Sequence, residues 1–143
     1  MKVATLLRNK GGEVATIQAD APVREAVAAM AARNIGALVV SSGDGTISGI
    51  ISERDVVRRL DRRGPDTLDD LVGAIMSEDV QTCSPDDEMS SLMALMTERR
   101  IRHVPVLVDG RLAGIISIGD VVKSRLGELE DDRRALYDYI NAR

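Results

Sequence analysis

Aromatic side chains are almost absent from this 143-residue chain, which has two Tyr and neither Phe nor Trp. Proteins that bind single-stranded nucleic acid commonly stack the bases on aromatic rings, and this sequence offers no such platform. The core must instead be built from Val, Ile, Leu, Ala and six Met residues. A flat ligand ring would have to be held by aliphatic walls and backbone groups.

Cysteine and histidine are equally scarce, since Cys83 and His103 are the single example of each. One cysteine cannot form an internal disulfide, and one Cys with one His cannot supply the ligands of a structural zinc site. The two residues also give little support for a cysteine nucleophile activated by a base. We therefore expect no metal site and no enzymatic activity.

The negative net charge and the lack of a long apolar run bear on the partners and the location of the protein. The formal net charge of −4 at pH 7 argues against a general role in binding DNA or RNA. No apolar run is long enough to cross a bilayer, and the opening MKVATLLRNKGG holds only a brief apolar run before charge returns. We expect a cytoplasmic protein that has neither a membrane nor a nucleic acid as its partner.

One short sequence motif, the phrase compared below, occurs twice in the chain. GIISERDVV begins at Gly49 and GIISIGDVV begins at Gly114. Upstream of the phrase, residues 14–40 align with residues 80–106, and an extra residue in the first turn (SSGDGT against VDGR) separates the two alignments. The sequence is therefore an internal duplication.

Each copy carries the same pattern of elements. A short β-branched stretch leads into a helix with apolar residues at i, i+3, i+4 and i+7, followed by two apolar strands around a Gly- and Asp-containing turn and by a second helix. Neither copy is long enough to bury a core alone. The pattern predicts an α+β fold in which two β-α-β-β-α repeats pack as a pseudo-twofold pair, with repeat 1 in residues 1–66 and repeat 2 in residues 67–143.

The second helices and the chain ends carry more specific expectations. We expect the N-terminal KVATLL segment to be a short helix that packs across the partner repeat. The residues after Gly127 are predicted to form a further helix, whose apolar stripe packs on the sheets or on a second subunit. The residues of the second helices that we expect to face the interior are Val56, Val57, Leu60, Val121, Val122 and Leu126.

Both copies end in the motif Gly-Ile-Ile-Ser-x-x-Asp, at residues 49–55 and 114–120. A tandem of β-α-β-β-α units that each end in this way resembles a pair of cystathionine-β-synthase (CBS) domains. The resemblance covers residues 3–126, and it is supported by Thr16, Thr82 and the strand Val104-Pro105-Val106. It implies a regulatory module that binds AMP, ADP or ATP, or NAD or S-adenosylmethionine, and that commonly assembles into a flat dimer.

The Ser-x-x-Asp part of the motif also has a purely structural explanation, because it is close to a helix-capping box. The two explanations are compatible, since a helix N-terminus presents backbone donors to an anion. The resemblance gives Asp55 and Asp120 the role of accepting hydrogen bonds from a ribose diol. Gly49 and Gly114 leave room for close backbone approach.

The resemblance implies two clefts, each built from parts of both copies. In each cleft a Ser and an Asp hold the ribose side, and residues of the other copy line an adenine pocket. The first cleft would combine Ser117 and Asp120 with Thr16, Ile17, Gly36 and Ala37. The mirror cleft would combine Ser52 and Asp55 with Thr82, Cys83, Arg102 and His103.

Residues that differ between the copies make the two clefts chemically unequal. Glu53-Arg54 corresponds to Ile118-Gly119, and Arg102-His103 corresponds to Gly36-Ala37. We expect Arg54, Arg102 and His103 to contact a phosphate. The alternatives are that Arg54 is a solvated helix-start charge and that His103 is a strand-edge residue with a satisfied hydrogen bond.

Two other features are expected to be structural. Cys83 replaces Ile17 of the first copy in an apolar strand, so we expect it to be a buried small hydrophobe. The charged run Glu98-Arg99-Arg100 is expected to be a solvated face.

The resemblance therefore predicts a non-enzymatic module that senses an adenosyl ligand, AMP first and ATP, NAD or S-adenosylmethionine next, with no catalytic cofactor. Its expected macromolecular partners are a second copy in a homodimer and an unidentified effector protein. The alternative is a ligand-free interaction scaffold that dimerises or docks on an effector.

Overall fold

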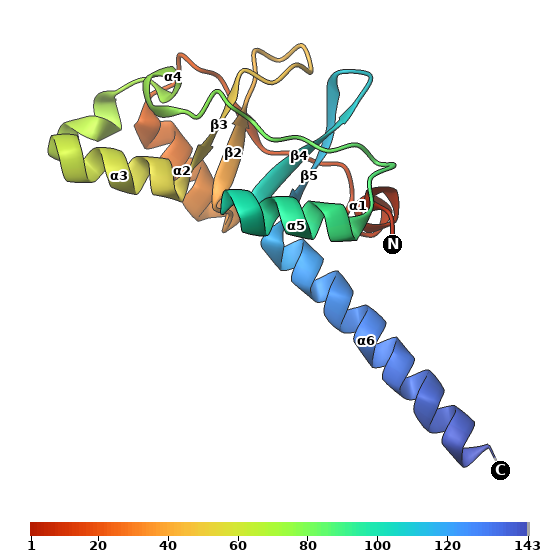
Figure 1. Ribbon diagram of the computed structural model, residues 1–143. Helices are drawn as coiled ribbons and strands as arrows, with labels where there is room; N and C mark the ends of the chain where they lie inside the picture. The colour runs from red at the N-terminus through yellow and green to blue at the C-terminus, as the bar shows by residue number, and fades with distance from the viewer. Residues whose placement is uncertain (143) are drawn as a thin grey trace.

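The computed structural model describes residues 1–142 and arranges them as two similar halves, from which one long helix projects (Figure 1). The first half consists of β1 (Thr16–Ile17), α2 (Val23–Arg33), β2 (Ala37–Val40), β3 (Gly49–Ser52) and α3 (Glu53–Arg63). The second half consists of α5 (Met89–Arg99), β4 (His103–Val108), β5 (Arg111–Ser117) and α6 (Ile118–Asn141). The leaders of the two halves are α1 (Val3–Lys10) and, after the 3₁₀ helix η1 (Gly64–Asp69), α4 (Val72–Ile75). The predicted α+β fold of two repeats is confirmed.

Each half has its own small sheet. The first has the order β1-β2-β3, with β1 parallel to β2 and β2 antiparallel to β3. The second pairs β4 with β5 antiparallel, and a single parallel bridge from Cys83 to Val106 takes the place of β1. The β4–β5 hairpin turns at Asp109 and Gly110, whose φ angles of 53° and 75° suit the tight turn that an Asp-Gly pair favours.

The two hydrophobic cores are each completed by the leader of the other repeat. Val3 and Leu6 of α1 are buried with side chains of α5, β4 and β5, whereas Val72 of α4 is buried with side chains of α2, β2 and β3. Figure 1 shows the N-terminus beside α5 accordingly. The expectation that the N-terminal helix packs across the partner repeat is therefore confirmed. The exchange ties the halves together, because removing either leader would open the core of the opposite repeat.

The packing of each leader on the opposite repeat explains why the repeated motif begins with glycine. A Cβ at Gly49 would lie 2.7 Å from the Met76 sulfur and 2.8 Å from the Ser77 carbonyl oxygen, and a Cβ at Gly114 would collide with the side chain of Leu7. The expected close backbone approach is therefore made by the chain's own leaders.

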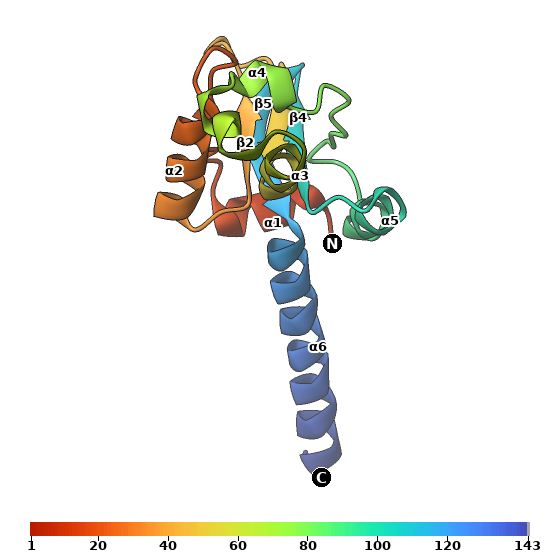
Figure 2. The same ribbon diagram turned by 90° about the vertical axis from the view of Figure 1, so that its left-hand side faces the viewer.

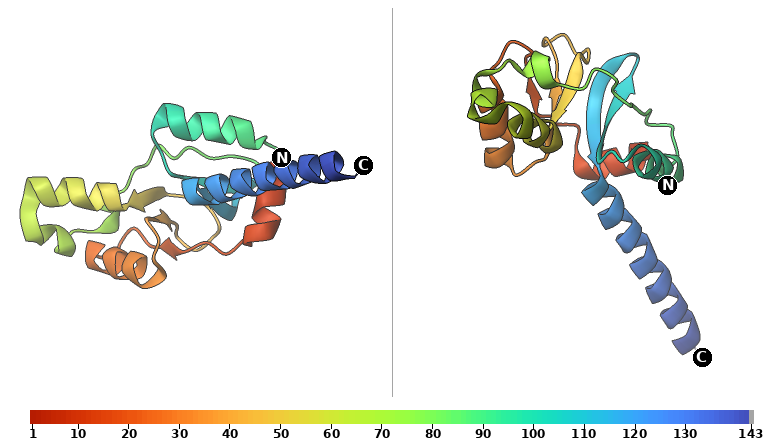
Figure 3. Two further views of the ribbon diagram at one scale, coloured as in Figure 1. Left: turned by 90° about the horizontal axis from the view of Figure 1, so that it is seen from below. Right: turned by 60° about the vertical axis from the view of Figure 1, so that its left-hand side comes forward.

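The expectation for the second helices is wrong for four of six residues. Val56 and Val121 are buried, but Val57, Leu60, Val122 and Leu126 are all exposed. η1 and α4 lie against other parts of α3, whereas α6 runs away from the body after its first turns (Figure 2 and Figure 3). Every residue from 129 to 142 is exposed. The C-terminal segment is helical as predicted, and it continues α6 directly instead of folding back on the sheets.

Candidate functional site

Both Ser-x-x-Asp motifs form complete capping boxes. The Ser52 hydroxyl accepts a hydrogen bond from the Asp55 amide (3.3 Å), and the Ser52 amide donates to Asp55 Oδ2 (2.8 Å). Ser117 and Asp120 repeat this geometry at 3.2 and 2.8 Å. The structural explanation of the motif is therefore correct, and it occupies one oxygen of each carboxylate.

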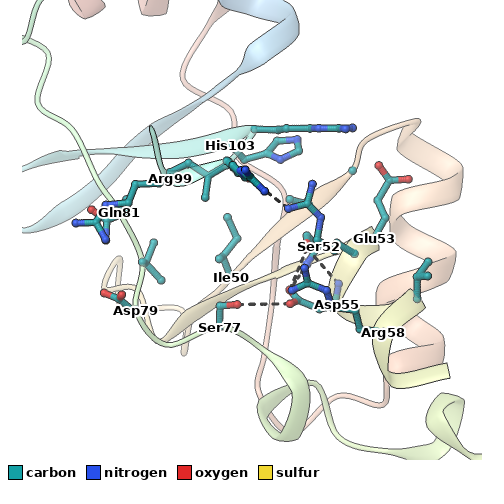
Figure 4. A pocket seen from close by; sticks show the side chains of 18 residues that line it. Ile50, Ser52, Glu53, Asp55, Arg58, Ser77, Asp79, Gln81, Arg99 and His103 are labelled. Carbon is teal, nitrogen blue, oxygen red and sulfur yellow. Dashed lines mark hydrogen bonds between the residues drawn. The ribbon is translucent and has the colours of Figure 1, made fainter. Parts of the chain in front are cut away.

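A cavity of about 600 Å³ lies beside Asp55, between the start of α3, the segment 77–81 and the end of α5 (Figure 4). This volume is in the usual range for a small-molecule site. The second carboxylate oxygen of Asp55 lies 3.5 Å from the Ser77 hydroxyl, at the limit of a hydrogen bond. It is therefore the oxygen available to a ligand. The apolar part of the lining comes from Ala37, Ile50, Val57, Val80 and Ile101.

The cavity is more positive than the rest of the molecule. Five arginines and three acidic residues line it, a difference of +2, whereas the whole chain carries −4. Such a local excess favours an anionic ligand, and guanidinium groups bind phosphate with two parallel hydrogen bonds. The charged residues of the lining are Arg54, Arg58, Arg99, Arg100 and Arg102, with Glu53, Asp55 and Asp79.

Arg100 has an unusual backbone at the cavity wall. Its φ of 54° places it in the left-handed region, which costs a residue other than Gly or Asn about 1–2 kcal/mol. The corresponding residue of the first copy is Asn34, which has the same φ and tolerates it better. The Arg100 carbonyl accepts a hydrogen bond from the Arg54 guanidinium (3.3 Å), which connects α5 to α3. Arg99 and Arg100 are exposed as expected, but they are also part of the site.

His103 is half-buried in the same wall. Burial lowers its pKa, and the nearby positive charges of Lys10 and Arg102 lower it further against the opposing effect of Glu53. The imidazole is therefore neutral at pH 7. It offers a ligand one donor and one acceptor and no positive charge, so the predicted phosphate contact would depend on Arg54 and Arg102.

Asp120, unlike Asp55, has a cationic partner from the chain itself among residues 1–142. The Lys10 ammonium group lies 2.6 Å from Asp120 Oδ2 and 2.6 Å from the Ile115 carbonyl oxygen. Burial raises the pKa of Asp120, but the hydrogen bonds from Lys10 and Ser117 outweigh it, and the pKa lies below its ordinary value. Lys10 therefore shares with the Ser117 amide the oxygen of Asp120 that caps α6, and its positive charge offsets the charge of this carboxylate.

The structure regroups the predicted site residues. The Asp55 cavity brings together Gly36, Ala37, Ser52, Arg54, Asp55, Arg102 and His103. Gly36 and Ala37 thus line the same cavity as Asp55, because the Gly36 carbonyl accepts a hydrogen bond from the Glu53 amide (3.0 Å) at the start of α3.

Four predicted adenine-pocket residues lie outside the cavity lining. Thr16 and Ile17 are on β1, paired with β2. Thr82 and Cys83 are replaced in the lining by the preceding Val80 and Gln81. Cys83 is buried as expected, and burial raises the pKa of its thiol to about 11, with Asp87 adding to the effect.

The sequence patterns did not predict several of the residues that line the cavity. Arg58 lies four residues after Arg54 on the same helix, so the i, i+4 spacing could have revealed it. Ser77, Asp79 and Gln81 follow the short helix α4 in an irregular segment, where no sequence pattern marks them.

Within residues 1–142, no three His, Cys, Asp or Glu side chains gather closely enough to hold a metal ion. In the same residues, no helix has both the length and the apolar character that a membrane span requires. The cytoplasmic location stays a prediction.

The model of the CBS domain family matches residues 9–62 and 72–127. The two matches cover most of the chain and correspond to its two repeats, so the protein belongs to the CBS domain family and contains a pair of these domains.

Known proteins agree with this assignment. The CBS domain-containing protein CBSX3, mitochondrial, of Arabidopsis thaliana is 35% identical over 96% of this chain and 71% of its own length. The crystal structure of the CBS-domain protein ATU1752 of Agrobacterium tumefaciens superposes with a TM-score of 0.85 at 44% identity, over 87% of this chain and 99% of the other. The CBS domain pair of protein MJ0100 matches with a TM-score of 0.76 at 25% identity, over 88% and 98% of the two chains, and its structure is a complex with 5′-methylthioadenosine and S-adenosyl-L-methionine.

Proposed function

We propose that this CBS pair is a non-catalytic regulatory module that binds a phosphate-bearing adenine nucleotide in the Asp55 cavity. The observation that carries the proposal is the combination of a carboxylate, one oxygen of which is not used by the helix cap, with five arginines around a cavity of about 600 Å³. AMP is the expected ligand, and ATP and NAD share its adenosine and phosphate groups. Occupancy would be transmitted to an effector through a change of conformation or assembly.

Asp55 is suited to hold a ribose because only one of its two carboxylate oxygens is used by the helix cap. Oδ2 accepts the capping hydrogen bond from the Ser52 amide, so the helix start holds the carboxylate in place. The other oxygen has only the 3.5 Å contact with Ser77, which a ribose hydroxyl could replace at a shorter distance. Ile50, Val80 and Ile101 offer apolar surface for the base.

The arginines decide between the candidate ligands. The adenosyl compounds in the MJ0100 complex support an adenosyl group here as well. S-adenosylmethionine, however, carries a positive sulfonium, which Arg54, Arg58 and Arg102 would repel. We therefore propose the order of affinity AMP, ATP and NAD before S-adenosylmethionine.

Calorimetric titration of the wild type and of Asp55→Asn with these four compounds tests the proposal. Asn retains a side-chain oxygen for the Ser52 amide, so the helix cap and the unfolding temperature should change little. Loss of a charge-assisted hydrogen bond to the ribose costs about 1.5–3 kcal/mol, which weakens AMP binding about 10- to 150-fold. Asp120→Asn is the matched control, and it should leave affinity at the Asp55 cavity unchanged.

AMP affinity that stays at the wild-type level in Asp55→Asn would contradict the assignment of the site. Failure of the wild type to bind any of the four compounds at millimolar concentration would favour the ligand-free scaffold instead.

We also propose that the module works as a homodimer. Support comes from exposed large apolar side chains on three helices, since an interface with a second copy would remove them from water. The side chains are Val57 and Leu60 of α3, Met93 of α5, and Val122 and Leu126 of α6.

A further inference from the structure

The projecting part of α6 carries its large apolar side chains on one stripe. Figure 3 shows the helix leaving the body without a neighbour along most of its length. The side chains of Val122, Leu126, Leu129, Leu136 and Ile140 are all about half exposed or more. Their spacing alternates between four and three residues once Arg133 is included. This is the a/d pattern of a coiled coil, continued over almost three heptads.

The other side of the helix differs sharply from this stripe. In the heptad register that places Leu126 at a and Leu129 at d, the outward b, c and f positions hold no large apolar residue from 127 to 141. They are occupied by Gly127, Glu128, Asp131, Arg134, Ala135, Asp138 and Asn141. Tyr137 and Tyr139 take the flanking e and g positions, where they would cover the edges of a seam.

The body of the protein leaves the stripe accessible. Val121, at a c position, is buried in the protein's own core, and the Ser124 hydroxyl, at an f position, contacts the Met1 sulfur (3.2 Å). These positions lie on the side of the helix opposite the a/d stripe, so the stripe faces away from the body. A partner helix can therefore approach along the full stripe without meeting the protein's own domains.

The helix also lacks the features of one that is stable alone in water. Gly127 lies in its interior and costs about 1 kcal/mol relative to Ala. The intrahelical ion pairs Arg125–Glu128 (2.9 Å) and Glu130–Arg133 (2.7 Å) are exposed, and each contributes only a few tenths of a kcal/mol. Most helices gain their stability by packing an apolar face, and this one has an unpacked face available.

We propose that α6 pairs through this stripe with α6 of a second copy, as a parallel coiled coil. The proposal refines the homodimer proposed above, and it does not depend on nucleotide binding.

The charged residues beside the stripe favour α6 of a second copy as the partner, and they favour a parallel over an antiparallel orientation. In a parallel pair, Arg125 at g lies opposite Glu130 at e of the partner helix, twice per dimer. The two Arg133 side chains, at a, meet in the seam, and each has Asp132 of the partner helix next to it and Glu130 of its own helix as an ion-pair partner. In the antiparallel pair that aligns all apolar layers, Glu130 would face Glu130 and Asp132 would face Asp132. Like charges in those positions destabilise the pairing, so the parallel arrangement is favoured.

Sedimentation or light scattering of the full chain over a concentration series tests the proposal. The wild type should reach twice the chain mass of 15.4 kDa. Leu129→Lys/Leu136→Lys should remain at the monomer mass, because it places charges in the seam. The matched control, Ala135→Lys/Asn141→Lys, adds the same charge on the outward side of the same helix and should dimerise as the wild type does.

Oxidative cross-linking of Leu136→Cys tests whether the two α6 helices run parallel or antiparallel. A parallel pair brings the two substituted positions together within disulfide distance, whereas an antiparallel pair places each opposite Leu126. Ala135→Cys, on the outward side, should not cross-link, and the native Cys83 is buried. Comparable thermal unfolding of all variants would show that the folded body is intact.

The proposal is overturned if the wild type stays monomeric throughout the series, or if the Lys double variant dimerises as well as its control. The second outcome would leave the homodimer standing and assign it to another face, such as α3. Absence of a cross-link in a dimeric Leu136→Cys variant would overturn the parallel arrangement.

Discussion

Lys10 should keep a nucleotide out of the second cleft, and Lys10→Met should open it. Its ammonium group makes two hydrogen bonds of 2.6 Å, to Asp120 and to the Ile115 carbonyl. A ligand that bound at Asp120 would compete with this ammonium group for the carboxylate.

The magnitude follows from the geometry and the exposure. Hydrogen bonds to charged groups contribute about 1.5–3 kcal/mol when buried. The Lys10 and Asp120 side chains are 29% and 24% exposed, so solvent screening reduces the contribution. We take about 1–2 kcal/mol for the two contacts together, which weakens binding in this cleft about 5- to 30-fold.

Calorimetry with AMP should detect one strong site in the wild type and two in Lys10→Met. The control is Lys2→Met, which removes the same charge from an exposed side chain just before α1. The unfolding free energy of Lys10→Met should also fall by about 1 kcal/mol, while that of the control stays near wild type. The reasoning is refuted if Lys10→Met titrates as a single site like the wild type, or if the wild type already shows two equal sites.

Two more predictions follow from the leader contacts. The pKa of Asp120 is lowered in the fold, so the stability that the Lys10 contact contributes is fully present above the ordinary aspartate value of 3.8 and is lost as the pH falls through the lower folded-state value. The difference in unfolding free energy between wild type and Lys10→Met should therefore be constant at neutral pH and shrink in acid; a difference that grows in acid would contradict this sign. Gly49→Ala should cost about 1–3 kcal/mol in thermal unfolding, since its methyl group would overlap the Ser77 carbonyl. Gly127→Ala, where a Cβ meets open space, should instead leave stability equal or higher; equal effects of the two changes would argue against the overlap.

Local patterns predicted most of the framework. The helix α2, the Asp109-Gly110 hairpin and both capping boxes depend on contacts between residues a few positions apart, so short stretches of sequence specify them. The duplication then predicted the pairing of two similar halves. The motif around Asp55 located one wall of the cavity for the same reason.

The candidate site as a whole could not be predicted in this way. Arg99, Arg100 and the segment from Ser77 to Gln81 reach the Asp55 cavity from the other repeat, and their local sequence resembles ordinary solvated surface. Val57 and Val122 repeat an apolar pattern that suggests burial, but Val57 lines the Asp55 cavity and α6 projects from the body at Val122 (Figure 1).

By itself, the amino-acid order determined the two repeats, their helices and hairpins, and the carboxylates at the helix starts, because hydrogen bonds and side-chain periodicity at short separation specify such features. Only the tertiary structure decided that the leaders exchange between the cores, that a cavity lies beside Asp55 and that Lys10 pairs with Asp120. The Lys10–Asp120 contact joins residues 110 positions apart. Contacts at that separation exist only once both cores have formed and the chain has been brought back on itself.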